Sequence, residues 1–470
     1  MRDVSELFKG QKDLESLKTL IHLAQELAIA RDHPQLCSIS LAVPYTEPLA
    51  VLDSVFDKNV PQFYIENTAL KESHAAAEAI IQKTDLHTKH RFIETQKWIN
   101  EWKDNCVCVS DPNLFLKGPV FFSGFPFTEE SVEDKAYVFV PRWHVSRKGN
   151  KYVAIANFLI DENTDTNQYA HFLWSLHEKF ITYDYSSLSK ESDGPEIELE
   201  PREEFGNSTS YKKWVQEGIH NIQNSKLDKI VLARCKTYKT HSLQLVLLLN
   251  RLRHQFKECY TFAFSPGEGK FFIGATPERL AMTEVGKLKT VAIAGSAPRG
   301  KTVSSDARLS HELLKSSKDL SEHTYVIDSI RRRLKKLGIE IKAQDTPHLL
   351  QLANVQHLQT FIEADIKEAS ILEIIDVLHP TAAVGGIPNQ LAKEKIATIE
   401  NWDRGYYAGP IGWLDTQGNG EFVVGIRSMR IYKNQVSVFA GAGIVNASNP
   451  EKEFTETELK FEAILKALGI

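Results

Sequence analysis

The sequence of 470 residues has few of the features that mark specialised classes of protein. It contains no run of eighteen apolar residues, so we expect no membrane-spanning helix. Residues 1–29 fit an amphipathic helix of mixed charge and lack the apolar core of a signal peptide. With a net charge of −5, the chain also lacks the excess of basic residues that general nucleic-acid binding requires. We therefore expect a cytoplasmic protein that binds neither membranes nor nucleic acid.

Cysteine is scarce, and its spacing is irregular. The five cysteines are an odd number without a disulfide or zinc pattern, which predicts reduced thiols. The sixteen histidines include no HxxxH pair with a third ligand nearby, so we do not expect zinc. What remains is an ordinary soluble composition, with 42% hydrophobic and 25% charged residues.

Long strands mixed with helices predict an α+β fold of stacked antiparallel sheets flanked by helices. The main predicted strands are 36–43, 119–122, 135–139, 229–236, 259–265, 270–275, 289–294, 353–364, 409–414, 422–432 and 435–442. The main predicted helices are 12–30, 68–83, 210–225, 242–256, about 303–337, and a last helix that begins at Pro450. The polar run 186–210 is expected to be an internal loop of one composite domain, with an N-terminal half 1–207 and a C-terminal region 208–470.

Near the C-terminus, a glycine turn leads into an acidic helix. Gly441 and Gly443 would let the backbone approach a ligand closely. At about 100° per residue, Glu453, Glu456 and Lys460 share one face of the helix. The neighbouring arc holds Phe454, Phe461, Ile464, Leu465 and Leu468, a plausible core stripe. Two carboxylates beside a buried stripe favour a hard-cation site, although a solvated acidic face fits the same pattern.

One basic and one acidic residue, Lys229 and Glu278, lie at the ends of predicted strands. Lys229 opens a strand that is apolar on both faces, where burial would push its amine towards neutrality and make it a candidate base. An exposed lysine at the strand start is the alternative. Glu278 follows a Gly-Ala-Thr-Pro turn, either at a sheet edge or in the first turn of a helix, where it would complement the dipole.

Other candidates are less specific. Asp319 and Glu322 share a face of the predicted helix 303–337. Strand alternation places Arg427 on an apolar face, where a buried charge needs either an anion or an internal salt bridge. His379 lies in a loop rich in glycine and proline, and loop histidines commonly lie at the surface.

Taken together, eight ordered motifs resemble the chorismate-utilising enzymes, the family of isochorismate, anthranilate, aminodeoxychorismate and salicylate synthases. The motifs are Lys229-Ile-Val-Leu-Ala-Arg, Ile273-Gly-Ala-Thr-Pro-Glu-Arg-Leu, Ala294-Gly-Ser, Lys318-Asp-Leu-Ser-Glu-His, Leu378-His-Pro-Thr, Tyr407-Ala-Gly-Pro-Ile-Gly, Val424-Gly-Ile-Arg and Gly441-Ala-Gly-Ile-Val with Glu453, Glu456 and Lys460. The resemblance spans residues 208–468 and is nearest to the menaquinone-pathway isochorismate synthases. Phe122-Ser-Gly-Phe and Phe139-Val-Pro-Arg-Trp extend it more loosely into the N-terminal half.

This resemblance implies a role for each candidate in a site between the sheets. Lys229 would be the general base that activates water, and Glu278 the general acid for the leaving hydroxyl, so that chorismate becomes isochorismate. Mg²⁺ would be bound by Glu322 and Glu456, with Glu453 and Asp319 in support. The implied substrate contacts come from Gly295, Ser296, His379, Arg427, Gly441, Gly443 and Lys460. Glu278 should lie in an apolar niche that raises its pKa.

Within the family, the resemblance favours water over ammonia as the nucleophile. The amine-adding anthranilate synthases lack a lysine at the position of Lys229, and Ala294-Gly-Ser is more similar to isochorismate synthases. No glutamine amidotransferase subunit is therefore expected. Salicylate synthase, which makes isochorismate and then eliminates pyruvate, is the closest alternative. A non-catalytic chorismate-binding relative is the alternative from another class.

Overall fold

The structure is a computed structural model of the chain. It describes residues 1–8, 13–54, 57–84, 86, 88–111, 113–181, 198–240, 243–352, 355–467 and 469. Leu468 of the predicted core stripe and residues 186–197 of the predicted polar loop lie outside the described residues.

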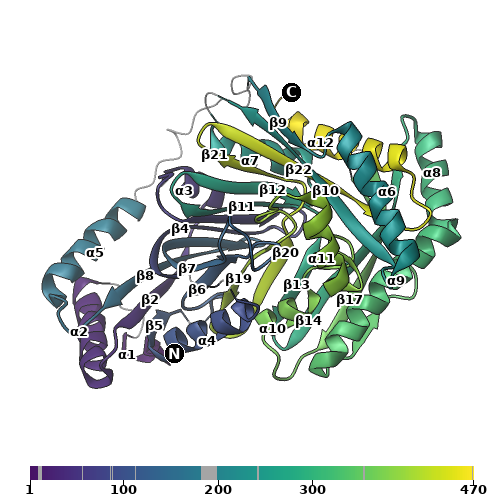
Figure 1. Ribbon diagram of the computed structural model, residues 1–470. Helices are drawn as coiled ribbons and strands as arrows, with labels where there is room; N and C mark the ends of the chain where they lie inside the picture. Colours follow the sequence, from purple (N-terminus) through teal and green to yellow (C-terminus); the bar gives the residue numbers. More distant parts are fainter. Residues whose placement is uncertain are drawn as a thin grey trace.

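One layer, here called the first sheet, runs from a surface strand through the middle of the chain to the N-terminal half (Figure 1). Its strands pair in the order β9 (Glu200–Phe205), β10 (Lys229–Lys239), β22 (Gln435–Ile444), β21 (Ser428–Tyr432), β12 (Lys270–Thr276), β11 (Tyr260–Gly267), β3 (Gln62–Asn67), β4 (Glu72–Lys83) and β7 (Tyr137–Lys148). The short β18 (Gly386–Ile387) pairs with the start of β10. All of these pairs are antiparallel, as the sequence predicts.

The other layer, here called the second sheet, branches from the same long strand β7. It continues through β6 (Val120–Gly124), β19 (Pro410–Asp415), β20 (Gly420–Val424), β13 (Arg279–Glu284), β14 (Lys287–Pro298) and β17 (Val355–Asp365), which also pairs with β15 (Ile341–Ala343) and β16 (His348–Gln351). A side branch holds β8 (Lys151–Ile160), β2 (Gln35–Val43), β5 (Cys106–Ser110) and β1 (Arg2–Asp3). Among the described strands, only the pairs made by β5 are parallel.

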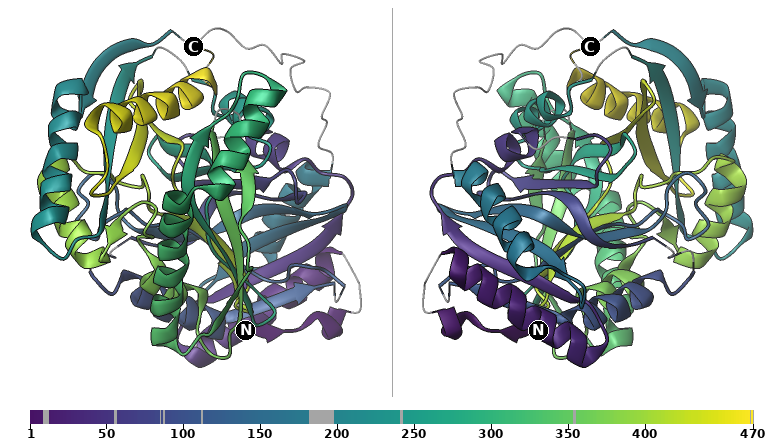
Figure 2. Two further views of the ribbon diagram at one scale, coloured as in Figure 1. Left: turned by 90° about the vertical axis from the view of Figure 1, so that its right-hand side faces the viewer. Right: turned by 90° about the vertical axis from the view of Figure 1, so that its left-hand side faces the viewer.

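Helices cover the outer faces of the two sheets. They are α1 (Ser5–Phe8), α2 (Leu14–Arg31), α3 (Pro48–Ser54), α4 (Arg91–Asp104), α5 (Thr166–Ile181), α6 (Ser208–Asn224), α7 (Leu245–Gln255), α8 (Val303–Lys315), α9 (Ser317–Leu334), α10 (Ile371–Leu378), α11 (Asn389–Glu400) and α12 (Pro450–Ala467). Helices α8 and α9 lie at one side of the molecule, and α2 and α5 lie at the opposite side (Figures 1 and 2). In the described part of the chain, no helix has the length and apolar content needed to cross a bilayer.

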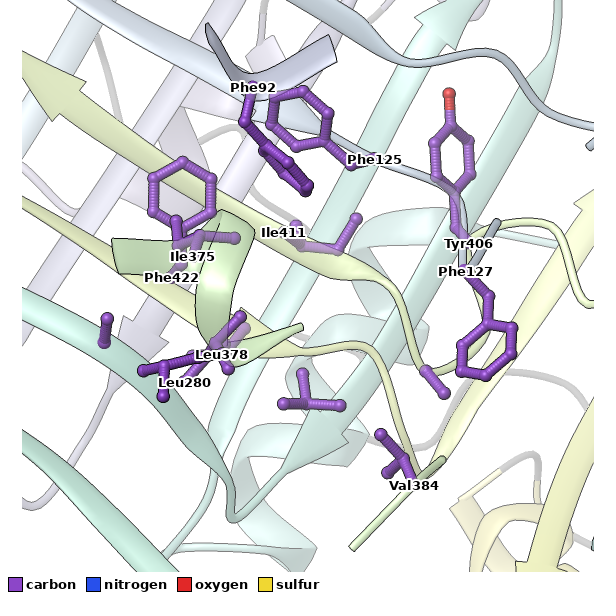
Figure 3. Close-up of a cluster of buried hydrophobic side chains, with 14 of the residues drawn as sticks. Phe92, Phe125, Phe127, Leu280, Ile375, Leu378, Val384, Tyr406, Ile411 and Phe422 are labelled. Atoms are coloured by element: carbon purple, nitrogen blue, oxygen red, sulfur yellow. The ribbon is translucent and has the colours of Figure 1, made fainter. Parts of the chain in front are cut away.

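The largest hydrophobic cluster joins the two halves of the sequence. Figure 3 shows Phe92, Phe125 and Phe127 from the N-terminal half in one cluster with Leu280, Val384 and Phe422 from the C-terminal half. Burial of large apolar side chains is the main favourable term in folding, so this shared cluster fixes the two sheets against each other. The cavity described below depends on that relative placement.

Four predicted elements differ from the structure. Residues 68–83 favour a helix through Ala75, Ala76 and Ala77, but β4 occupies 72–83 because β3 and β7 pair with both of its edges. The predicted helix 303–337 is two helices, since the hydroxyl of Ser316 accepts a hydrogen bond from the backbone of Asp319 and caps α9. The predicted strand 422–432 is interrupted, because Arg427 has a left-handed backbone with φ 49°. Within the predicted loop 186–210, residues 200–205 form β9 and α6 begins at Ser208.

Candidate active site

A cavity of about 240 Å³ lies between the first and second sheets. The first sheet contributes residues from β10 and β22, the second contributes residues from β14 and β17, and α9 and α12 close the remaining sides. Nearly every residue predicted for the site lines this cavity: Lys229, Glu278, Gly295, Ser296, Asp319, Glu322, Arg427, Gly441, Gly443, Glu453, Glu456 and Lys460. The prediction of a site between stacked sheets is confirmed.

Lys229 begins β10 and is buried, with 7% of its surface exposed. In the ladder with β22, Val231 is opposite Gly443. A Cβ at Gly443 would lie 2.9 Å from Cε of Lys229, so a glycine there leaves room for the lysine side chain. Lys229 Nζ donates a hydrogen bond to Oε1 of Glu322 at 2.8 Å. The alternative of an exposed lysine is therefore wrong.

Glu278 lies on the turn between β12 and β13, with 6% of its surface exposed. Its Oε1 accepts a hydrogen bond from the hydroxyl of Thr381 at 2.9 Å. Burial raises the pKa of Glu278 to about 7, although Thr381 and the charge of Lys229 act in the opposite direction. The predicted rise in its pKa is present. The alternative helix position is wrong because the strand β13 follows directly at Arg279.

Arg427 extends into the cavity from the turn between β20 and β21. Its Nη2 lies 3.2 Å from Nε2 of His357, and its Nη1 is buried without a hydrogen-bond partner. In the part of the chain that the structure describes, Arg427 forms no ion pair, so the predicted alternative of an internal salt bridge is wrong. Burial lowers the pKa of this guanidinium. A partly buried cation without a counter-charge favours an anionic ligand.

The acidic side of the cavity is formed by α9 and α12. Burial alone would raise the pKa of Glu322, but the Lys229 ammonium beside it leaves that pKa lowered. Burial raises the pKa of Glu453, and the charge of Glu456 acts in the same direction. Lys460 pairs with Glu456 at 2.8 Å and donates to the carbonyl of Gly441 at 2.7 Å. These residues face the cavity, so the alternative of a fully solvated acidic face is wrong.

The carboxylates do not form a compact metal cluster in this arrangement. Among the residues that the structure describes, no three histidine, cysteine, aspartate or glutamate side chains are grouped closely enough to hold a metal ion. Glu322 and Glu456 are instead paired with Lys229 and Lys460. Their donor set consists of carboxylate oxygens, the chemistry that a hard divalent cation prefers.

Comparison with known proteins identifies the family. Residues 22–469 match the family described as "Chorismate binding enzyme". The chain belongs to this family. The Bacillus subtilis protein "Isochorismate synthase MenF" is 34% identical over 464 residues, 96% of this chain and 96% of the relative. The Pseudomonas aeruginosa protein "Salicylate biosynthesis isochorismate synthase" is 30% identical over 467 residues, 97% of this chain and 95% of the relative.

A solved structure supports the same assignment of this chorismate-binding enzyme. The structure of MenF, the menaquinone-specific isochorismate synthase from Escherichia coli, aligns with a TM-score of 0.76 at 25% identity. The alignment covers 96% of this chain and all of that chain, 100%. The predicted family and the predicted α+β fold are both confirmed.

One predicted substrate contact is wrong. His379 is not among the residues that line the cavity. It is buried, and its Nε2 lies 2.9 Å from the carbonyl oxygen of Phe127. Its ring also packs edge-on against Phe92 and Phe127. Because its Nε2 is hydrogen-bonded to Phe127 of the N-terminal half, His379 contributes to the packing around the site and does not line the cavity.

Several residues of the site were not predicted, and three of them have side chains that matter for its chemistry. Tyr407 and His357 line the cavity, and Thr381 holds Glu278. Tyr407 and Thr381 belong to motifs that carry the family resemblance, so their presence in those motifs was the available signal. His357 gave only a weak signal, a single imidazole within a strand, and its neighbours appear only when β14, β17 and the Arg427 turn are assembled.

Proposed function

We propose that this enzyme is an isochorismate synthase that converts chorismate to isochorismate, with Mg²⁺ bound, for menaquinone biosynthesis. In this reaction water adds at ring carbon 2, the hydroxyl leaves carbon 4, and the ring double bonds shift. One water enters and one leaves, so atoms balance without an oxidant. The observation that carries the proposal is that one cavity holds both a buried lysine and a buried glutamate with a pKa near neutrality.

Lys229 is the proposed general base. In its neutral form the amine accepts a proton from water as the oxygen attacks the ring. It begins a buried strand, and Gly443 of β22 leaves room beside its side chain, which lines the cavity. A base must lie within hydrogen-bond reach of the proton it takes, so this placement is the first requirement.

Glu278 is the proposed general acid. A glutamate with an ordinary pKa would be almost fully ionised at neutral pH and could not donate a proton. Burial raises the pKa of Glu278 to about 7, which leaves a substantial protonated fraction at that pH. The proton goes to the departing hydroxyl, which leaves as water.

The proposed substrate anchors are cations with free donor capacity. Arg427 would pair with the enolpyruvyl carboxylate, because its buried Nη1 has no partner in the described chain. The backbone at Gly441 and Gly443 lines the same cavity, and Gly295 and Ser296 would contact the region of the leaving hydroxyl. Two carboxylates on chorismate account for cationic groups at both ends.

Glu322 and Glu456 are the proposed Mg²⁺ ligands, supported by Glu453 and Asp319. All four line one cavity and supply the carboxylate oxygens that a hard divalent cation prefers. When bound, Mg²⁺ supplies positive charge that offsets the ring carboxylate of the substrate. Lys460 would assist at the same end.

A product assay tests this proposal. The enzyme is incubated with chorismate, with and without Mg²⁺, and the products are separated by chromatography. Metal-dependent formation of isochorismate alone supports the proposal. Stoichiometric pyruvate and salicylate would instead identify a salicylate synthase, and binding of chorismate without turnover would identify a non-catalytic relative. Restoration of menaquinone in cells that lack their own isochorismate synthase tests the pathway.

A further inference from the structure

His357 lies between Ser296 and Arg427 on the cavity wall. It belongs to β17, and in the ladder with β14 it is directly opposite Ser296. Its Nδ1 lies 2.8 Å from Oγ of Ser296, and its Nε2 lies 3.2 Å from Nη2 of Arg427. The imidazole therefore joins the turn between β20 and β21, which carries Arg427, to strand β14, which carries Ser296.

The chemistry of the partners decides where the imidazole proton lies. A guanidinium can only donate, so Nε2 must accept from Arg427. In a neutral imidazole the proton is then on Nδ1, which donates to Ser296 Oγ. Ser296 uses its oxygen as acceptor, and its own hydroxyl proton is left to point elsewhere. Since Ser296 lines the cavity, that proton is available to a ligand.

We propose that His357 is a positioning residue that orients Arg427 and Ser296 for chorismate through a directed hydrogen-bond chain from Arg427 to His357 to Ser296. The proposal rests on the proposed function for the identity of the substrate. Fixing Nη2 on His357 leaves Nη1 of Arg427 free for a carboxylate. Fixing Oγ of Ser296 turns its hydroxyl into a donor for the hydroxyl region of the substrate.

The surroundings of the ring support the neutral form. His357 is buried, and burial together with the charges of Arg427 and Lys460 holds its pKa well below the usual range. The only influence in the opposite direction is a hydrogen bond with the backbone of Gly295. A cationic imidazole would place a second positive charge against Arg427.

The first test measures the tautomer of the ring without substrate. In ¹⁵N-histidine-labelled enzyme at pH 7, the ¹⁵N shifts of His357 should show a neutral ring with the proton on Nδ1. Its signals are assigned by their loss in a His357 variant or by their shift in Ser296→Ala. A proton on Nε2, or a cationic ring, would overturn the proposal. This result does not depend on whether chorismate is the substrate.

The second test separates the two contacts. The amide of His357→Asn reaches the position of Nδ1 and can still donate to Ser296, but it is too short to accept from Arg427. The amide oxygen of His357→Gln reaches the position of Nε2 and keeps the Arg427 contact alone. We expect the Asn variant to raise KM for chorismate by about tenfold, and the Gln variant to lower kcat by about fivefold with KM near normal, the losses typical of one charged and one neutral hydrogen bond.

The control is His348→Gln, which changes an exposed histidine of the adjacent strand β16. It should leave KM, kcat and Tm unchanged. If both His357 variants instead show the same rise in KM and the same fall in kcat, together with a lowered Tm, the role of His357 is merely structural and the proposal is overturned. The wild-type product assay is separate, since failure to form isochorismate would reject the proposed function and leave the ¹⁵N measurement standing.

Discussion

The two ends of the cavity treat the same residue type in opposite ways. Glu278 is held by a neutral hydroxyl in a buried niche, and its pKa rises to about 7. Glu322 is held by the Lys229 ammonium, and its pKa is lowered although burial opposes this. The partner and the burial, not the residue type, decide which glutamate has a raised pKa and which has a lowered one.

The largest effect is expected from removing a carboxylate at the acidic end of the cavity, where α9 and α12 meet it. Glu456→Ala should reduce isochorismate formation to background and abolish any response to Mg²⁺, because it removes a proposed ligand and the partner of Lys460. Steady-state rates over a Mg²⁺ titration provide the measurement. Glu462→Ala, on an exposed position of the same helix, is the matched control. A Glu456→Ala enzyme that keeps wild-type Mg²⁺ dependence would remove this residue from the metal site.

Loss of the amine between the two ends should be nearly as damaging. Lys229→Ala should lower kcat by at least about 10², the smaller end of the range for losing a general base. The exposed Lys226→Ala, three positions earlier, should leave kcat unchanged. Circular dichroism checks that both variants are folded. A kcat close to that of wild type would contradict the assignment of Lys229 as base.

Substitution of Glu278, at the other end of the cavity, should change the pH dependence of kcat. Wild-type kcat should fall as the pH rises through about 7, because the acid form of Glu278 is lost there. Glu278→Gln cannot titrate or donate in the same way, so kcat should drop by at least about 10² and this alkaline decline should disappear. The pH profile of kcat from pH 5.5 to 9 is the measurement. If the decline persists in Glu278→Gln, another group is responsible for it.

The smallest expected effect is a shift in the pKa of Glu278 when its hydrogen-bond partner is removed. The hydroxyl of Thr381 lowers the pKa of Glu278 against burial, so Thr381→Val should move the alkaline decline of kcat to higher pH. One neutral hydrogen bond is worth about 1 kcal/mol, which corresponds to less than about one pH unit. Thr398→Val, at an exposed helical position, should leave the profile unchanged. A decline that moves to lower pH would show that the hydroxyl of Thr381 does not lower the pKa of Glu278.

Much of the site was predictable because its residues follow local signals. The double-sided apolar pattern placed Lys229 on a buried strand, and Pro450 marked the start of α12 correctly. The Gly441 and Gly443 positions were expected to approach a ligand, and both line the cavity. His379 was wrongly predicted as a substrate contact, because nothing near it in the sequence shows that its ring would be hydrogen-bonded to the carbonyl oxygen of Phe127.

Periodicity, turn residues and motif order by themselves determined the main elements around the cavity, the family and most of the charged residues that line it. Only the tertiary structure decided that β4 is a strand, that Arg427 lies on a left-handed turn, and that His357 joins it to Ser296. It also decided that the pKa of Glu322 is lowered and that the pKa of Glu453 is raised. The reason is physical: Lys229 and Glu322 are 93 positions apart, and Glu278 and Thr381 are 103 apart. Electrostatic interactions depend on distance and burial in space, which local sequence does not record.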